Sequence, residues 1–210
     1  MAPKYRKRGF PLAGSRLFKY VVSPQSLVST ISKNTDTSEQ SWNVLMFSAL
    51  KQERLLRALL AYDFSVTNRD RSMFLRNFIE HPEVKGCFAL NERDEVVGYT
   101  AITRTGSRRK NRYKIAPLFA NDVTTAKSLL TTLILISRAV TENETIVVYI
   151  LEDTIGDHIF AQFLDSVTGT ERQHHPACGE TLFSREPNRI DLIQRDKCFI
   201  PHNNCCHFDA

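Results

Sequence analysis

The most restrictive feature of this sequence is a proline inside a short apolar segment that runs almost directly into a helical pattern. The segment reads YKIAPLFANDVTTAKSLL, residues 113 to 130, with Pro117 inside its apolar part. Proline cannot donate a hydrogen bond to a neighbouring strand, so within a sheet it is tolerated mainly at a bulge or at an edge. A bulge bends the strand and interrupts the hydrogen-bonded ladder. We therefore expect a kinked strand with room beside it for the backbone of a ligand.

The corner that follows this strand predicts the start of a helix. The first amides of a helix lack intrahelical acceptors and, together with the helix dipole, they bind anions. Thr124 and Thr125 could add hydroxyl donors to such a site. Asp122 argues the other way, because its carboxylate is a good cap and would compete with a phosphate for the same amides. An anion site and a capped core helix that binds nothing are both open interpretations.

Periodicity along the rest of the chain predicts alternating helices and strands. Pro24 opens a possible helix, and the polar run at 32–41 is a loop or linker. Asp70 supplies cap chemistry for a helix that ends after Glu80, with a buried stripe of Met73, Phe74 and Phe78. We expect strands at 17–23, 145–151, 179–184 and 197–202, helices at 44–61, 122–140 and 155–167, and a hairpin that joins 87–90 to 96–103.

Composition and charge narrow the class of protein. The chain has 42% hydrophobic and 24% charged residues, which suits one or two globular domains. Its longest strongly apolar run, residues 129–136, is far shorter than the roughly 20 residues of a membrane span, so we expect no transmembrane helix. Five cysteines, an odd number, do not indicate a disulfide framework, and a reducing compartment is the simpler assumption.

The excess of positive charge lies at the N-terminus, where no acidic residue precedes Asp36. The segment PKYRKRGF, residues 3–10, fits a solvated arm, an organelle transit segment, or a signal for nuclear import or nucleic-acid binding. No aromatic-interleaved RNA motif or zinc-finger spacing supports nucleic-acid binding. We expect a cytoplasmic protein without membrane contact, with mitochondrial or nuclear location as the alternatives that the basic arm leaves open.

Three stretches resemble the GNAT (Gcn5-related) N-acetyltransferase superfamily. They are YDFSVTNRDRSMFLRNF (62–78), EVVGYTAI (95–102) and the proline-containing stretch at 113–130. Within the superfamily they are most similar to the C-terminal GNAT-like domain of tandem acetyltransferases, with the N-terminal domain mostly absent. The resemblance implies a mixed, mainly antiparallel sheet flanked by helices. It divides the chain into a basic arm (1–17), an N-terminal remnant (18–61), a GNAT-like acyl-CoA-binding domain (62–185) and a C-terminal strand and tail (186–210).

The resemblance also implies a cosubstrate, acetyl-CoA, and transfer of its acetyl group to an unknown amine. In such proteins the pantetheine arm pairs with the bulged strand, and the pyrophosphate lies on amides at the start of the next helix. Carried over, the pantetheine contacts are Leu118, Phe119 and Ala120, and the pyrophosphate contacts are Asn121, Val123, Thr124, Thr125 and Ala126. An inactive GNAT-fold binding or regulatory module is the alternative function.

The catalytic residues stay unassigned. Leu164 or Phe163 aligns where many members place a tyrosine that protonates the leaving thiolate, and neither can transfer a proton. Asp157 takes roughly the position of an asparagine that often opens that helix. Glu152 and Asp153 could supply a base or be exposed loop acids, and Tyr99 could face the cleft or the core.

Two further groups of residues carry alternatives. The basic loop at 104–112 fits a solvated hairpin tip, or a contact with the 3′-phosphate of coenzyme A or an acidic partner. The Cys- and His-rich tail at 198–207 lacks the Cys-x-x-Cys pair common in zinc sites, so we expect no metal there.

Overall fold

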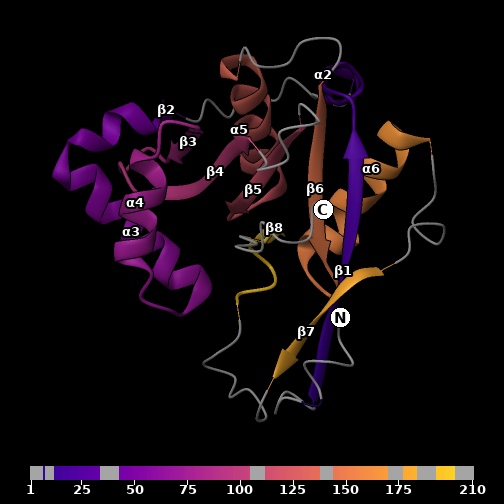
Figure 1. Cartoon of the computed structure of the whole chain (residues 1–210). Coiled ribbons are helices and arrows are strands. Elements are labelled where there is room, and N and C mark those ends of the chain that lie inside the picture. Colours follow the sequence, from indigo (N-terminus) through magenta and orange to yellow (C-terminus); the bar gives the residue numbers. More distant parts are fainter. Residues whose placement is uncertain are drawn as a thin grey trace.

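The computed structural model shows one mixed sheet with helices on both faces (Figure 1). It describes residues 7, 12–33, 43–104, 112–137, 144–169, 177–183 and 193–201. The strands are β1 (Leu12–Val22), β2 (Asn43–Met46), β3 (Val84–Leu90), β4 (Val96–Arg104), β5 (Arg112–Ala120), β6 (Thr145–Leu151), β7 (Ala177–Phe183) and β8 (Cys198–Ile200).

Within the described residues the strand order is β2-β3-β4-β5-β6-β1-β7, and β8 pairs with β5 off this path. The pair β5–β6 is parallel, whereas the other described pairs are antiparallel. The mixed, mainly antiparallel sheet that the sequence predicts is therefore confirmed. The one parallel pair among the described strands includes β5, the strand that contains Pro117.

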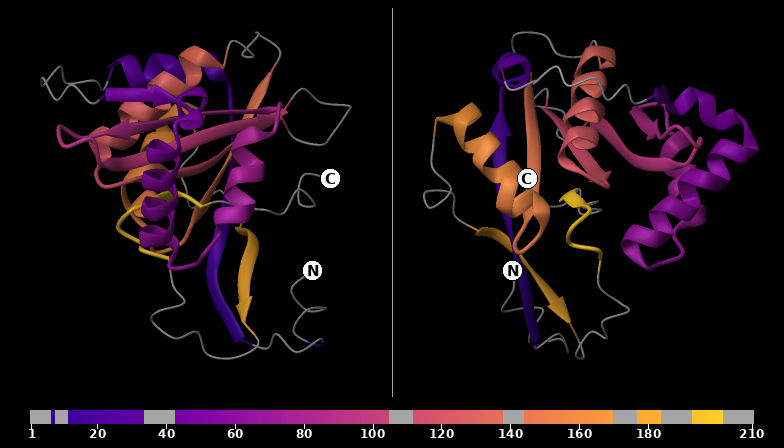
Figure 2. Two further views of the ribbon diagram at one scale, coloured as in Figure 1. Left: turned by 90° about the vertical axis from the view of Figure 1, so that its left-hand side faces the viewer. Right: turned by 180° about the vertical axis from the view of Figure 1, so that it is seen from behind.

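Helices lie against both faces of the sheet (Figures 1 and 2). The helical elements are α2 (Pro24–Lys33), the 3-10 turn η1 (Phe47–Lys51), α3 (Glu53–Thr67), α4 (Ser72–Glu80), α5 (Val123–Ile136), the π-helical turn η2 (Gly156–Phe160) and α6 (Ala161–Thr168). One apolar core lies under α2, α5 and α6, and the other lies under η1, α3 and α4. Of the helices in the described part of the chain, none has the length and apolar character that a membrane crossing needs.

Strand β1 places the N-terminal part of the chain in the sheet, one strand in from the β7 edge. It lies between β6 and β7, with Leu17 opposite Leu151 of β6 and opposite Gly179 of β7. Tyr20 on this strand is fully buried. The arm expected at 1–17 therefore needs a correction, because residues 12–17 are strand; residues 1–6 and 8–11 lie outside the described residues.

Two other expectations on the N-terminal side are wrong. The helix expected at 44–61 is a strand over 43–46, a 3-10 turn and then α3, which begins at Glu53. The sequence shows this break as an imperfect helical phase near Lys51. In α4 the fully buried residue is Leu75, and Phe74 and Phe78 pack partly buried against the same core as expected. Only Met73 departs from the expected stripe, since it is 76% exposed.

The expected elements from the hairpin onward agree with the structure. The hairpin is β3–β4, and the continuous apolar segment at 145–151 is strand β6. The helix expected at 155–167 is η2 followed by α6, and the two late strands are β7 and β8. The division into four regions stays an expectation, since β1 and β8 share a sheet with the predicted GNAT-like region.

Candidate functional site

Pro117 produces the bulge that its chemistry predicts. Thr100 of β4 pairs with Leu118, but Ile102 pairs with Ile115, so β5 carries one extra residue between these two pairs. The Pro117 carbonyl accepts a hydrogen bond of 2.8 Å from the buried Thr100 hydroxyl. The Thr100 hydroxyl thus satisfies the Pro117 carbonyl at the bulge, where the regular strand pairing is interrupted. A buried carbonyl needs such a partner.

The bulge marks the point where β5 leaves its parallel partner. Before it, Arg112 to Ile115 pair with Thr145 to Val148 of β6. After it, the pairing on this side of β5 passes to β8, with Leu118 opposite Ile200 and a further backbone hydrogen bond of 3.1 Å from Ala120 N–H to the Lys197 carbonyl. Two parallel strands that diverge at their carboxyl ends create the kind of crevice that binds ligands in α/β proteins. Here the crevice contains a segment of the same chain.

The three residues expected to face pantetheine are all fully buried. Leu118, Phe119 and Ala120 each have 0% exposure. Leu118 and Ala120 belong to the core under α5, and Phe119 belongs to the core under α3 and α4. Their backbone pairs with β4 on one side and with β8 on the other. The backbone groups that would pair with pantetheine are therefore already paired with β8.

The residues expected around the pyrophosphate lie together at the start of α5. Asp122 caps this helix: its carboxylate accepts hydrogen bonds from the Thr125 amide at 2.7 Å and from the Thr125 hydroxyl at 2.8 Å. Thr124 is exposed and Thr125 is buried. The carboxylate would therefore compete with an anion for this helix end. At the Thr125 amide the structure agrees with the alternative to an anion site, a capped helix.

Asn121 lies between β5 and the Asp122 cap and has two partners. Its amide donates to the Val97 carbonyl at 2.9 Å, and its side-chain oxygen accepts from the Tyr62 hydroxyl at 3.3 Å. Burial raises the pKa of Tyr62 far above its usual value, and the nearby Asp122 adds to the rise. Tyr62 therefore stays a neutral donor across the physiological range.

A second part of the crevice lies between α5 and the turn η2. The space that remains there is about 30 Å³, enough for a water molecule or two. It is lined by Val123, Ala126, Lys127, Leu130, Ile159, Phe160, Phe163 and Phe199. The ring of Phe199, from β8, meets the Phe160 ring edge-on at 6.5 Å. An arm the size of pantetheine does not fit while this ring is in place.

The opposite face of β5 carries a buried polar cluster that sequence reasoning did not find. Asp63 of α3 accepts hydrogen bonds from both Arg71 and the Tyr99 hydroxyl, the latter at 2.5 Å. Burial and the neighbouring Asp63 carboxylate raise the pKa of Tyr99 well above its usual value. The Tyr99 ring also meets Phe119 edge-on, with centroids 5.6 Å apart. The cluster therefore ties α3 to β4 directly beneath the bulged half of β5.

The two acids considered as bases have other partners. Glu152 accepts hydrogen bonds from the Arg16 guanidinium at 2.8 and 2.5 Å and from the Arg16 amide at 2.9 Å. Asp153 forms an ion pair of 3.3 Å with Arg195. Both acids therefore link the end of β6 to other segments.

The helix residues considered for proton transfer cannot supply a proton. Leu164 is fully buried, and Phe163 lines the small cavity. Asp157 is buried at the start of η2 and accepts a hydrogen bond of 3.0 Å from the Asp153 amide. The described residues around the crevice thus leave the catalytic groups unassigned, as expected from the sequence.

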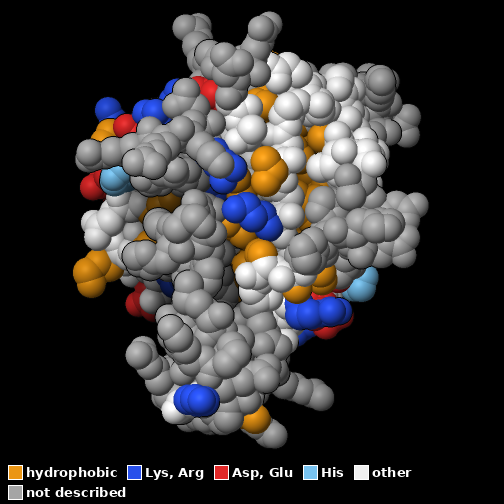
Figure 3. Space-filling model, turned by 45° about the vertical axis from the view of Figure 1, so that its right-hand side comes forward, with side chains coloured by type: hydrophobic (Ala, Val, Ile, Leu, Met, Phe, Trp, Pro, Cys, Tyr) orange, Lys and Arg blue, Asp and Glu red, His pale blue; other side chains and the backbone are white. Residues whose placement is uncertain are grey.

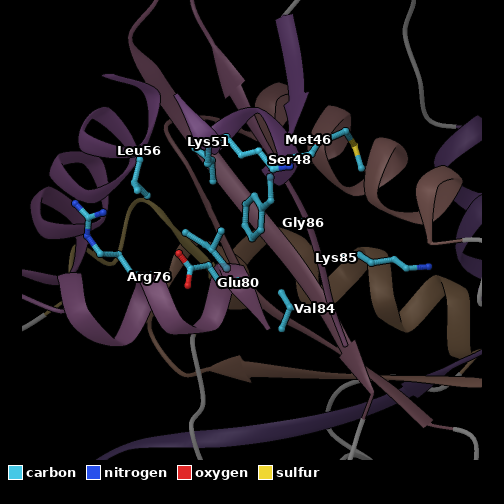
Figure 4. Close-up of a pocket in the computed structure, with 12 residues that line it drawn as sticks. Met46, Ser48, Lys51, Leu56, Arg76, Glu80, Val84, Lys85 and Gly86 are labelled. Carbon is cyan, nitrogen blue, oxygen red and sulfur yellow. The ribbon is translucent and has the colours of Figure 1, made fainter. Parts of the chain in front are cut away.

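A larger hollow lies at another edge of the sheet, with a volume of about 440 Å³ (Figure 4). It is formed by η1, α3, α4 and the first residues of β3, and its lining is mainly apolar. The Phe47 ring lies against Gly86, where an added Cβ would come within 2.2 Å of the ring. In the sheet, β4 separates this hollow from β5, so it is not continuous with the crevice.

The charged features considered in the sequence are mostly outside the described residues. This holds for residues 1–6 and 8–11 of the basic arm, for residues 105–111 of the basic loop and for the tail at 202–210. Among the described residues no group of His, Cys, Asp and Glu could hold a metal ion. On the face shown in Figure 3, the described Lys and Arg side chains lie scattered among apolar and uncharged surface.

The comparison with known protein families addresses the bulged strand and its surroundings. Residues 59–153 match the family model described as an acetyltransferase (GNAT) domain. This segment is therefore similar to GNAT acetyltransferase domains, and it is called the GNAT domain below. The GNAT domain runs from α3 to the turn after β6, and it includes the bulge and the first helix after it. Strands β1, β2, β7 and β8 lie outside the matched segment.

Individual proteins extend the comparison beyond the GNAT domain. An uncharacterized Caenorhabditis elegans protein, F36G3.2, is 28% identical over 212 aligned positions, which cover all of this chain and 63% of that protein. The chain thus spans less than two thirds of the length of this relative. A conserved protein of unknown function from Staphylococcus epidermidis has a TM-score of 0.47 at 11% identity, over 86% of this chain and 62% of its own. A GNAT-family acetyltransferase from Staphylococcus aureus has a TM-score of 0.38 at 18% identity, over 65% and 90%.

Proposed function

We propose that this chain is an N-acyltransferase-like protein that takes an acetyl group from acetyl-CoA and passes it to an amine. The observation that carries the proposal is the crevice: within the GNAT domain, β5 bulges at Pro117, leaves its parallel partner β6 and runs into the first turn of α5. The resemblance implies pantetheine beside residues 118–120 and the pyrophosphate near residues 121–126. These contacts are part of the proposal.

With β8 in place, the crevice does not fit this cosubstrate. The backbone edge after Pro117 is paired with β8, and about 30 Å³ remains between α5 and η2. We therefore derive no catalytic step, and we name no general acid or base. The proposal requires instead that acetyl-CoA and β8 occupy the crevice at different times.

A calorimetric titration with acetyl-CoA tests the proposal, with Thr124→Glu as the matched variant. Thr124 is exposed in the first turn of α5, so a carboxylate there changes the charge near the expected pyrophosphate without disturbing the core. We expect the affinity for acetyl-CoA to fall about tenfold or more. The new carboxylate and the pyrophosphate would lie a few ångströms apart, and the repulsion between like charges at that distance is large enough for such a loss. The control is Leu135→Glu, which adds the same charge at the other end of α5, where Leu135 is 70% exposed.

The three titrations distinguish the proposed site from binding elsewhere and from no binding. Binding to the natural chain and to the Leu135 variant, weakened in the Thr124 variant, supports the proposed site. Equal affinity in all three chains would place acetyl-CoA elsewhere. No heat of binding in any of them, at concentrations of both components well above those typical of cosubstrate affinities, would remove acetyl-CoA from the proposal.

One observation favours a second candidate, an inactive GNAT-fold binding or regulatory module. Leu164 and Phe163 take the place where the resemblance leads us to expect a proton donor, and neither side chain can transfer a proton. Release of free thiol from acetyl-CoA in the presence of a panel of amines distinguishes the two. Thiol release indicates an enzyme, whereas thermal stabilisation by coenzyme A without thiol release indicates the binding module.

A further inference from the structure

Strand β8 uses the same backbone edge of β5 that the proposed function assigns to acetyl-CoA. Leu118 pairs with Ile200, Phe119 pairs with Cys198, and the Ala120 amide donates to the Lys197 carbonyl at 3.1 Å. Each backbone amide and carbonyl on one edge of a strand can serve one partner strand at a time. An amide-containing arm and β8 therefore exclude each other from this edge.

The side chain of Phe199 blocks the second part of the crevice. It is 1% exposed and lines the small cavity between α5 and η2. The backbone of β8 also comes very close to η2, because a Cβ added to Gly156 would lie 2.0 Å from the Phe199 carbonyl oxygen. The backbone conformation of Gly156 does not itself require glycine, since its φ lies outside the left-handed region. Its missing side chain is what lets β8 lie against η2.

The segment before β8 is held by backbone hydrogen bonds and by side-chain contacts. Ile193 packs partly buried against the core under α3 and α4, and the Arg195 guanidinium donates to the Ser15 hydroxyl at 3.1 Å. The Gln194 amide donates to the Val66 carbonyl of α3 at 2.7 Å, and the Ile155 amide donates to the Arg195 carbonyl at 2.8 Å. The Arg195 side chain pairs with Asp153 at 3.3 Å, and these two side chains are 41% and 66% exposed. An exposed ion pair of this kind contributes little to stability. The segment crosses the crevice from α3 to η2 on these contacts.

We propose that residues 193–201 are an intramolecular gate, an autoinhibitory strand that closes the acetyl-CoA crevice and must leave before the cosubstrate binds. The inference rests on the proposed function and adds its regulation. The observed affinity for acetyl-CoA is then reduced by the fraction of molecules in which β8 has left β5. A change that favours the departure of β8 raises that affinity without touching the cosubstrate.

The test is Gly156→Ala, with Gly179→Ala as the matched control. An alanine Cβ at position 156 collides with the Phe199 backbone, whereas at position 179 the nearest atom is 3.8 Å away. We expect Gly156→Ala to speed hydrogen exchange at residues 198–200 and at the Ala120 amide, and to tighten acetyl-CoA binding about tenfold or more by raising the open fraction. Gly179→Ala changes neither. A second variant, Phe199→Ala, empties the groove without altering η2 and acts in the same direction.

Cys198 provides an independent readout in the natural chain. Its thiol is fully buried under β8's partners, so alkylation reports the departure of the strand. Acetyl-CoA, whose sulfur is already acylated, is added before iodoacetamide, and each cysteine is followed by mass spectrometry. The gate predicts that acetyl-CoA accelerates alkylation of Cys198 and leaves Cys87, buried under α5, unchanged.

Three outcomes decide the matter. Tighter binding in Gly156→Ala or Phe199→Ala together with faster alkylation of Cys198 supports the gate. Binding of acetyl-CoA to the natural chain with Cys198 still protected, and with affinity unchanged in both variants, overturns the gate and leaves the proposed function standing. Absence of binding in the natural chain and in both variants, with β8 shown by exchange to be released, overturns the proposed function and the gate with it.

Discussion

Before Pro117, strand β5 is paired with β6; after Pro117, its partner on the same side is β8. The first partner has seven residues and is itself paired with β1, whereas the second has three and lies close to the C-terminus. Both halves of β5 are fully buried near the bulge. Burial is therefore equal, but among the described strands β8 pairs with β5 alone, so its departure would leave the other strand pairs in place. Local opening is expected where a buried segment is held by few and replaceable contacts.

The other side of the second half of β5 is held firmly, and removing Asp63 should show how firmly. Asp63→Ala leaves the Arg71 guanidinium, whose side chain is 17% exposed, without its carboxylate, and takes away the acceptor of the Tyr99 hydroxyl. Breaking a buried ion pair in this way costs about 3–5 kcal/mol of unfolding free energy. Urea denaturation measures the loss. Glu53→Ala, which breaks an exposed pair with Arg57 and Arg76, is the control and should change stability little.

This prediction tests the contrast directly. If Asp63→Ala lowers the unfolding free energy by less than about 1 kcal/mol, the cluster is not what holds the β4 side of the second half. After Pro117, the β4 side of β5 would then be held no more strongly than the β8 side. The explanation that β8 is the more weakly held partner would fail.

Replacing the Asp122 cap should separate stability from binding. Asp122→Ala removes the acceptor of the Thr125 amide and should cost about 0.5–2 kcal/mol, the usual range for the loss of a helix cap. Affinity for acetyl-CoA should rise, because a carboxylate no longer competes with the pyrophosphate for the start of α5. Asp70→Ala is the control, since Asp70 accepts a hydrogen bond from the Ser72 amide at the start of α4. A drop in affinity in the Asp122 variant would mean that the cap is needed to shape the site.

A matched pair of substitutions compares the two partners of β5. Ile115 in the first half and Ile200 in β8 are both fully buried, and each loses one methylene in Ile→Val. Ile115→Val should lower the free energy of global unfolding by about 0.5–1.5 kcal/mol. Ile200→Val should affect the global value less, because β8 can leave before the sheet unfolds, and should instead speed exchange at residues 198–200. Equal global losses would show that β8 unfolds together with the rest of the sheet.

The mildest probe changes no residue and uses pH. Burial raises the pKa of both the Cys198 and the Cys87 thiols to about 12. A raised pKa means that the folded state keeps its proton where the unfolded chain loses it, so these thiols favour folding below the ordinary thiol pKa and the advantage is lost as the pH rises toward 12. Between pH 8 and 10, both buried thiols should therefore be alkylated more slowly than the exposed Cys178.

The same experiment ranks the two buried thiols. Cys198 should react faster than Cys87, since alkylation of a buried thiol requires opening and β8 opens more readily than the inner strand β3. The reverse order would contradict the difference between the two partners of β5.

The sequence was informative wherever a covalent or local property decides the structure. Pro117 lacks an amide hydrogen whatever surrounds it, so its bulge could be predicted from its position alone. The continuous apolar run at 145–151 is a buried strand with the predicted bounds. By contrast, the strand at 43–46 was missed because its four residues continue the apolar spacing of the helix that follows.

The candidate site shows where local reasoning ends. A strand at 197–202 was expected, but its partner was not, because no local pattern connects Leu118 with Ile200 across the intervening chain. The cluster around Asp63 left a fainter signal: an acid stands among the apolar positions of a helix, and Arg71 follows within a few turns. The cofactor residues at 118–126 stay a prediction, because their neighbours in space depend on whether β8 is present.

The position of β1 has a practical consequence. It covers the edge of β6 that faces away from β5, and residues 17 and 151, which it brings together, are far apart in the chain. A fragment cut at the limits of the GNAT domain would leave that edge bare, and bare edges of apolar strands recruit other molecules. Such a fragment should precipitate or self-associate. The natural chain should fold slowly. Strand β1 pairs with β6, and the long intervening chain must form a closed loop before these two strands can meet.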